Sequence, residues 1–297
     1  MLFLDTMESE TEIIEIGTGF LESFKYKKAI EFFTRAIEIN PSNSQTFELR
    51  GIAWYRILEI ENALADISKA IELDKQNHNA WYNKGEILKY KKHYTEAELC
   101  YKEADYIYPG SFFYITGLIQ TSLALKKYPE AIKYCNQILK EEPADHIALY
   151  NRGIAYSKQI NYQLAINDFL KLIETGKRTP TNYSNLGYWY SKIGELRKAS
   201  NNLSVSIQLN PNHPYAINNL GFVKYLEGNY KDALELVNKS LLIDSSNSYA
   251  YKNRALIYLK TSQKKLALED LSKAKFLGYA EDYNNEVNEL LKIEFGL

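Results

Sequence analysis

The sequence predicts an all-α protein built from repeated pairs of helices. Two observations within the 297 residues support this: eight alanines, each 34 residues after the last, and a tiny residue twelve positions before seven of them. A period of this length is typical of stacked supersecondary units. The alanines are Ala29, Ala63, Ala97, Ala131, Ala165, Ala199, Ala233 and Ala267. The residues twelve positions earlier are Gly17, Gly51, Gly85, Ile119, Gly153, Gly187, Gly221 and Ala255.

Residues 181–212 show why each period predicts two helices. An apolar stripe at helical spacing runs through Tyr183, Leu186, Gly187 and Tyr190. The pattern breaks at Gly194, and a second stripe follows at Ala199, Leu203 and Ser206. Pro211 ends the second helix. The tiny residue on the first helix and the alanine on the second allow the two helix axes to approach closely.

The repeated pattern resembles the tetratricopeptide repeat family: a large apolar residue, then Leu-Gly, Tyr, Ala, an aromatic residue, Ala and Pro over 34 residues. The repeats begin at residues 10, 44, 78, 112, 146, 180, 214 and 248, and the closing proline is present as Pro41, Pro109, Pro143 and Pro211. The resemblance covers residues 10–281. It implies a right-handed α-solenoid, or superhelix, of eight helix-turn-helix repeats plus a C-terminal capping helix.

The two ends of the chain complete this organisation. Residues 1–9 are expected to form an N-terminal tail, and residues 282–297 a capping helix. Tyr283, Val287, Leu290 and Leu291 form one apolar stripe in this last segment, with acids and amides opposite. An open stack of repeats needs such a helix to cover its last apolar face.

The fourth repeat departs from the pattern. Ile119 replaces the expected glycine, and Ile138 replaces an expected alanine. Because bulkier residues at close contacts push helices apart, we predict altered packing or curvature around residues 111–145.

Composition and motifs exclude several classes of function. Lys and Arg total 36 against 37 Asp and Glu, which argues against a general binder of nucleic acids or membrane surfaces. Cys100 and Cys135 have no metal-ligand spacing, no catalytic motif appears, and pairs of carboxylates are expected on solvated faces. We therefore predict a non-enzymatic protein without cofactor or metal. The start lacks a signal peptide, and no apolar run is long enough to span a membrane, so we predict a cytoplasmic location.

Helix geometry predicts which face of each first helix is free. At about 100° per residue, positions 4, 7, 8 and 11 of a repeat lie on the core side, and positions 2, 6, 9 and 13 lie opposite. Positions 5 and 12 lie beside this opposite face. In the family that the chain resembles, the opposite face lines a concave groove that holds partner peptides.

Asparagine recurs at position 6 of five repeats, as Asn83, Asn151, Asn185, Asn219 and Asn253. An amide both donates and accepts hydrogen bonds, so such a ladder can pair with the backbone of an extended peptide whatever its sequence. The alternative is that these asparagines only satisfy polar groups of neighbouring repeats.

Aromatic and basic residues on the same face complete the candidate groove. Position 9 carries apolar residues in the last four repeats, expected to be at least partly exposed, and position 2 adds Phe113, Ile147, Tyr215 and Tyr249. An exposed apolar surface of this kind indicates a partner, unless neighbouring repeats bury it. The candidate peptide-binding residues are Asn151, Asn185, Asn219, Asn253, Tyr150, Tyr188, Phe222, Tyr225, Lys158, Lys192 and Lys260.

Charge divides the predicted groove and indicates its partner. The first three repeats offer Glu22, Glu48 and Glu86 together with Arg56 and Lys89, whereas the last four offer Lys158, Lys192, Lys252 and Lys260. A basic, aromatic C-terminal half suits an extended protein segment with acidic and apolar side chains. Self-association through an edge of the stack or the fourth repeat remains an alternative. Binding of RNA by a helical repeat is less favoured, because the charge is balanced.

Overall fold

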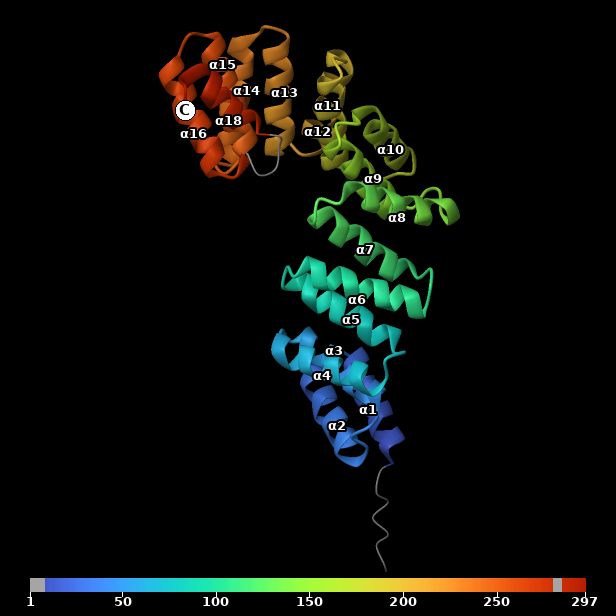
Figure 1. Ribbon diagram of the computed structural model, residues 1–297. Coiled ribbons are helices and arrows are strands. Elements are labelled where there is room, and N and C mark those ends of the chain that lie inside the picture. Colours follow the sequence, from blue (N-terminus) through green and yellow to red (C-terminus); the bar gives the residue numbers. More distant parts are fainter. Residues whose placement is uncertain (1–8, 280–284) are drawn as a thin grey trace, which may run out of the picture. The chain divides into compact units, whose positions relative to one another are not determined.

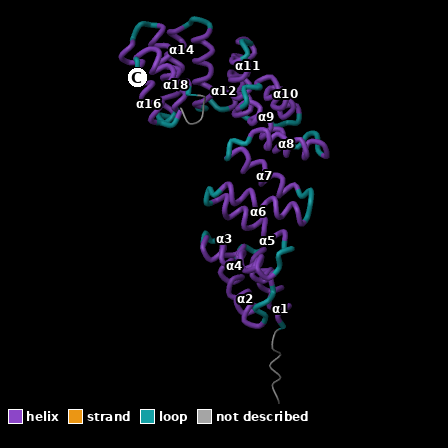
Figure 2. Tube along the Cα trace, in the orientation of Figure 1, coloured by secondary structure: helices purple, strands orange, loops and turns teal. Residues whose placement is uncertain are grey.

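The described part of the chain is entirely helical. The computed structural model describes residues 9–279 and 285–297, and these contain seventeen α-helices and no strand (Figures 1 and 2). The chain divides into two compact units, residues 1–143 (unit 1) and residues 144–297 (unit 2). No helix in the described ranges combines the length and the apolar character needed to cross a membrane.

Each unit is a series of antiparallel helix pairs, and each helix packs on the next along the chain (Figure 1). Unit 1 contains α1 (Glu10–Glu22), α2 (Tyr26–Ile39), α3 (Ser44–Arg56), α4 (Ile60–Leu73), α5 (His78–Tyr90), α6 (Tyr94–Ile107), α7 (Phe112–Ala124) and α8 (Tyr128–Glu141). Unit 2 contains α9 (His146–Lys158), α10 (Tyr162–Glu174), α11 (Pro180–Lys192), α12 (Leu196–Leu209), α13 (Pro214–Leu226), α14 (Tyr230–Ile243), α15 (Ser248–Lys260), α16 (Lys264–Phe276) and α18 (Glu286–Phe295). The predicted all-α solenoid class is confirmed.

Local sequence signals set where the helices start. The first helix of most pairs begins after a side chain that accepts a bond from the free backbone amides of the first turn, as Asn77 does from Ala80 and Asp145 from Ala148. The three residues that separate the two helices of each pair then include one residue in the left-handed region. These residues are Phe24, Leu58, Lys92, Lys126, Ile160, Gly194, Gly228 and Ser262.

The contact between the two helices of a pair depends on the missing side chain of glycine. A Cβ placed on Gly153 would lie 2.7 Å from the ring of Phe169, which is fully buried. The same clash would occur at Gly17 against Phe33 and at Gly51 against Ile67. Glycine on the first helix therefore makes room for a large side chain four positions after the repeat's alanine.

The fourth repeat reverses the sizes of these two residues. Ile119 replaces glycine, and Cys135 replaces the large partner, while both are completely buried. A glycine contact instead lies two positions before Ile119, where a Cβ on Gly117 would lie 2.7 Å from the Tyr101 ring of the preceding repeat. The volume of Ile119 is thus offset by its partner's small size, and an altered curvature around residues 111–145 stays a prediction.

Three repeats carry a buried ion pair between their helices. In each, one guanidinium forms two hydrogen bonds of 2.6–2.9 Å with one carboxylate sixteen residues later. The pairs are Arg50–Asp66, Arg152–Asp168 and Arg254–Asp270. The three aspartates are buried. The two-pronged geometry orients the helices relative to each other.

The last helix, α18, packs on α16 and covers the apolar end of unit 2. Val287 and Leu291 are buried in one cluster with Ala255, Ala267 and Leu271. The apolar stripe predicted for this helix also included Tyr283, which lies outside the described residues.

The glycine contact yields a stability prediction. We expect Gly85→Ala to lower the free energy of unfolding by about 1–3 kcal/mol. The added Cβ would lie 2.7 Å from the Tyr101 ring, which its hydroxyl bond to Glu86 holds in place. Denaturation by urea, followed by circular dichroism, measures the change.

Gly19→Ala is the matched control for this measurement. Gly19 lies in α1 with no neighbouring atom within 4 Å of an added Cβ. Because alanine favours a helix over glycine by up to about 1 kcal/mol, this variant should be more stable than the wild type. Equal effects of the two substitutions would contradict the packing account.

Candidate functional site

The first helices of unit 2 form a wall with two adjoining cavities. Helix α13 packs against both α11 and α15, so their free faces are continuous. We call the surface that carries Tyr150, Asn151, Asn185, Tyr188, Tyr215, Asn219 and Tyr249 the inner wall of unit 2. Both cavities open on this wall, and Thr181 lines both of them.

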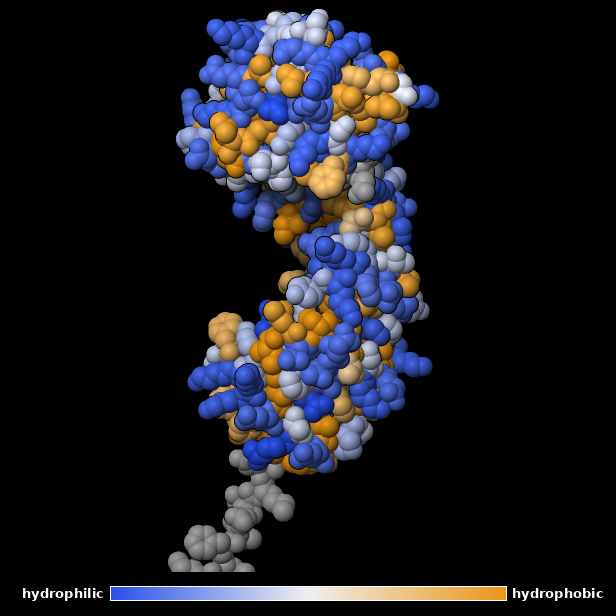
Figure 3. Space-filling view, turned by 90° about the vertical axis from the view of Figure 1, so that its left-hand side faces the viewer, coloured by the Kyte–Doolittle hydropathy of each residue, from blue (hydrophilic) through white to orange (hydrophobic). Residues whose placement is uncertain are grey.

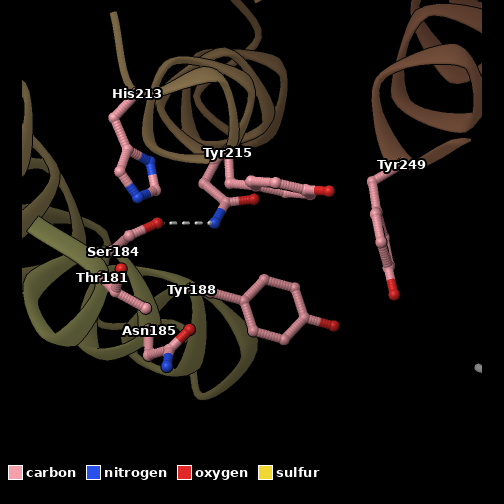
Figure 4. A pocket seen from close by; sticks show the side chains of 8 residues that line it. Thr181, Ser184, Asn185, Tyr188, His213, Tyr215 and Tyr249 are labelled. Atoms are coloured by element: carbon pink, nitrogen blue, oxygen red, sulfur yellow. Dashed lines mark hydrogen bonds between the residues drawn. The ribbon is translucent and has the colours of Figure 1, made fainter. Parts of the chain in front are cut away.

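The first cavity has a volume of about 400 Å³ and an aromatic and amide lining. Its lining residues are Thr181, Ser184, Asn185, Tyr188, His213, Tyr215, Asn219 and Tyr249. Figure 4 shows Tyr188 and Tyr215 on neighbouring helices, with their hydroxyl groups pointing to the same side, and Tyr249 facing them. The rings of Tyr215 and Tyr249 meet edge to face at 6.2 Å. The cavity therefore offers ring surfaces together with hydrogen-bonding groups, and among the described residues its lining includes no aspartate, glutamate, lysine or arginine.

Polar contacts hold part of this lining in place. Asn219 donates a long hydrogen bond of 3.5 Å to the Ser184 hydroxyl (Figure 4). Nδ1 of His213 accepts from the backbone amide of Ala216 at 3.1 Å and so caps α13. Burial lowers the pKa of His213, so the imidazole is neutral at pH 7 and carries its proton on Nε2.

The second cavity, of about 450 Å³, lies between α9 and α11. It is lined by His146, Ile147, Tyr150, Asn151, Leu172, Lys177, Thr179, Thr181 and Asn182. The side-chain nitrogen of Asn151 donates a hydrogen bond to the carbonyl oxygen of Ile147 on its own helix. This bond uses the nitrogen of the amide and not its oxygen. Lys177 is exposed and adds a positive charge to this cavity.

The structure brings together five of the sequence-predicted residues at these cavities. Asn185, Tyr188 and Asn219 line the first, and Tyr150 and Asn151 line the second. The side chain of Lys192 lies beside the first cavity, with its Nζ 5.4 Å from the Tyr188 ring centre. Lys158 and Lys260 line neither cavity; Lys158 is half-buried at the end of α9, and Lys260 is exposed at the end of α15.

Phe222 and Asn253 are not accessible, contrary to the expectation for the face they share. Asn253 is 5% exposed and donates to Asn218 at 3.0 Å, and its own oxygen is buried without a hydrogen-bond partner among the described residues. Phe222 is 9% exposed and stacks on Tyr225, which is half-buried. In the last repeats this face is therefore covered rather than open.

Tyr279 and Glu286, the latter at the start of α18, provide this cover. Tyr279 is 3% exposed, packs on Tyr249 and donates to Glu286 at 2.8 Å. Glu286 pairs with Lys252, whose Nζ lies over the ring of Phe222. Lys252 was expected to contribute a basic group to the groove, but it is 4% exposed and held inside this network. The chain thus occupies the C-terminal end of its own inner wall.

Sequence reasoning missed the small polar residues of the first cavity. Thr181 and Ser184 belong to α11 but show no repeated pattern, and no motif marked His213. The recurrence of position 6 asparagines gave a signal for Asn185 and Asn219, whereas nothing in one sequence distinguishes Ser184 from other helical serines.

The described residues hold no cluster suited to a metal ion, and one of the two thiols is strongly desolvated. No group of three histidines, cysteines or acids lies close enough to bind a metal ion in residues 9–279 and 285–297. Burial raises the pKa of the Cys100 thiol to about 11, so it stays protonated near pH 7.

Comparison with known proteins follows the repeat. Profiles described as tetratricopeptide repeat match residues 20–43, 78–111 and 117–182. A crystal structure of a tetratricopeptide repeat protein from Parabacteroides merdae superposes with a TM-score of 0.72 at 20% identity, covering 84% of this chain and 98% of that one. At this identity the similarity shows a shared fold.

Curated relatives match over shorter stretches. A DnaJ homolog subfamily C member 3 homolog from Dictyostelium discoideum is 25% identical over 199 residues, which is 60% of this chain and 40% of the relative. Serine/threonine-protein phosphatase 5 from Homo sapiens is 31% identical over 113 residues, 31% of this chain and 23% of the relative. The chain spans less than half of the length of these relatives. Tetratricopeptide repeats commonly mediate protein–protein interaction and are generally non-enzymatic, although some relatives are enzymes.

The buried lysine yields a pH prediction. Burial lowers the pKa of Lys252 from its ordinary 10.5 to about 8. Between these values the unfolded chain holds more protons than the folded one, so the free energy of unfolding should rise with pH, by at most about 1.4 kcal/mol per pH unit from this group. Urea denaturation at pH 8, 9 and 10 measures the slope.

Lys252→Met should flatten this slope, because it removes the group that releases its proton on folding. Lys260→Met, which changes an exposed lysine at the end of the same helix, should keep it. An unchanged slope in Lys252→Met would show that the lysine is not desolvated in the folded protein.

Proposed function

Because the chain is a tetratricopeptide repeat protein, we propose that the inner wall of unit 2 binds an extended segment of another protein. The observation that carries this proposal is the pair of adjoining cavities, which share Thr181 and combine side-chain amides with tyrosine rings. Amides can bond a peptide backbone independently of its sequence, and cavities between them take side chains.

Each part of the wall has a distinct role in this proposal. Asn185 and Asn219 bond the backbone of the bound segment, one helix apart. An apolar or aromatic side chain of the segment enters the first cavity against Tyr188 and Tyr215, where ring contacts and burial favour it. A second side chain enters the cavity beside Tyr150.

Charge gives the segment a preferred composition. Lys177 lines the second cavity, and Lys192 lies beside the first. An acidic side chain near either lysine is favoured by a charge attraction that salt screens. On the face shown in Figure 3, hydrophobic side chains form separate patches among hydrophilic ones.

The covered end of the wall sets the limit of the binding surface. Tyr279 and Glu286 occupy the inner faces of the last repeats. The bound segment therefore lies over α9, α11 and α13 and ends near Tyr249. In this proposal the chain acts as a non-enzymatic scaffold, and any catalytic activity belongs to a partner.

We expect that peptides selected from a random phage-displayed library for binding to the full chain need the side-chain amides of Asn185 and Asn219. The double variant Asn185→Ala/Asn219→Ala should lose about tenfold or more in affinity, because two hydrogen bonds to the peptide are removed. Fluorescence anisotropy with a labelled selected peptide measures the dissociation constant.

The matched control is Asn201→Ala, an exposed asparagine on α12, which should bind like the wild type. Peptides that bind the double variant as tightly as the wild type would rule out this wall as their site.

Neutralising the two lysines tests the preference for acidic residues. Lys177→Gln/Lys192→Gln should weaken selected peptides several-fold at low ionic strength, and the difference should shrink as salt rises above about 0.5 M. Lys260→Gln serves as the control, since Lys260 lines neither cavity. Equal affinities at low salt would refute the charge preference while leaving the role of the amides intact.

A further inference from the structure

Unit 1 contains a cavity with a different chemistry from those of unit 2. It has a volume of about 320 Å³ and lies on the first helices α3, α5 and α7. Its lining is Glu48, Asn79, Tyr82, Asn83, Phe113 and Tyr114. One carboxylate thus meets three aromatic rings and two amides in a space of side-chain size.

The carboxylate of Glu48 is buried, with the imidazole of His78 near enough to lower its pKa. The residue is 8% exposed. Its two oxygens accept hydrogen bonds from neutral amides, Asn77 Nδ2 at 2.9 Å and Asn83 Nδ2 at 3.2 Å. Within the described ranges no lysine or arginine forms an ion pair with it. A carboxylate removed from water without a countercharge is costly, and this cost is recovered when a cation arrives.

Burial raises the pKa of two groups at this site. The pKa of Glu48 lies above its ordinary range because of desolvation, although its amide partners oppose the shift. The pKa of Tyr82 is raised to about 12 by burial and by the nearby charge of Glu86. Burial is the main cause of both shifts, since it disfavours the charged form of each acid.

Three aromatic rings enclose the space beside Glu48. The centre of the Tyr82 ring lies 5.4 Å from that of Tyr114 and 6.3 Å from that of Phe113. The Tyr114 hydroxyl bonds His78 Nδ1 at 2.6 Å, which fixes that ring. Phe113 is 72% exposed, so one wall of the enclosure projects into solvent. An exposed aromatic ring beside a buried carboxylate is not explained by packing within the unit.

We propose that this cavity binds the cationic side chain of a lysine or arginine from a partner protein. The charge of the side chain pairs with Glu48, and the faces of Tyr82, Phe113 and Tyr114 attract the cation and cover its methylene groups. A neutral apolar side chain would bury Glu48 further without compensation, and an anion would be repelled.

The proposal does not depend on peptide binding by unit 2. All lining residues belong to α3, α5 and α7, and the test uses single amino-acid derivatives that are too small to span a wall of helices. Failure here leaves the function proposed for unit 2 untouched, and failure of that function leaves this site testable.

The experiment is a nuclear magnetic resonance titration of the full ¹⁵N-labelled chain with two matched probes, Nα-acetyl-lysine amide and Nα-acetyl-norleucine amide. The lysine derivative should shift the side-chain amide signals of Asn79 and Asn83 with millimolar affinity, and the norleucine derivative should not. Nα-acetyl-arginine amide is the third probe, and its affinity relative to lysine decides which cation the site prefers.

Two variants place the binding at this cavity. Phe113→Ala should weaken the lysine probe by about three- to tenfold, and Glu48→Gln by about tenfold or more. Tyr106→Ala and Glu61→Gln, both exposed and outside the cavity, should bind like the wild type. Because Phe113 is largely exposed, its variant tests the site even if Glu48→Gln disturbs folding.

Equal binding of the norleucine and lysine probes would overturn the proposal. So would an absence of shifts with both cations, or a Phe113→Ala variant that binds as tightly as the wild type.

Discussion

The fold depends on one repeated contact, a glycine on the first helix of a pair facing a large buried side chain on the second. Phe33, Ile67, Tyr101 and Phe169 each fill the space that a Cβ on the facing glycine would take. The close approach that results presents the remaining face of every first helix on one side of the unit. The binding surfaces that we propose for both units lie on those faces, so they depend on this packing contact.

The fourth repeat shows that this constraint acts on the pair of residues rather than on glycine alone. Ile119 and Cys135 exchange the large and small roles, and both remain fully buried. The total volume at the contact is what must be kept. Buried Arg–Asp pairs add orientation in three other repeats, where two parallel hydrogen bonds join the helices.

Periodicity in the sequence was enough to predict the fold, because Ala165 and its seven counterparts report a contact made inside each repeat. It also placed Asn185, Asn219 and Tyr188 on the inner wall, since helix geometry alone decides their face. It failed for Phe222, Asn253 and Lys252, which share that face but are covered by Tyr279 and Glu286. Such a cover is a contact between distant segments, and no local pattern reports it. The same limit hid how the rings around Glu48 meet, because Tyr82 comes from one following repeat and Phe113 and Tyr114 from the next.

The two units therefore carry cavities of different charge on equivalent helix faces: those of unit 2 have Lys177 and Lys192 in or beside them, and that of unit 1 contains Glu48. The most direct test of the central claim is a crystal structure of the full chain with a selected peptide. The account predicts an extended peptide whose backbone bonds the side chains of Asn185 and Asn219, with one of its side chains between Tyr188 and Tyr215. A peptide seated on the second helices of the pairs, α10, α12 or α14, would contradict it.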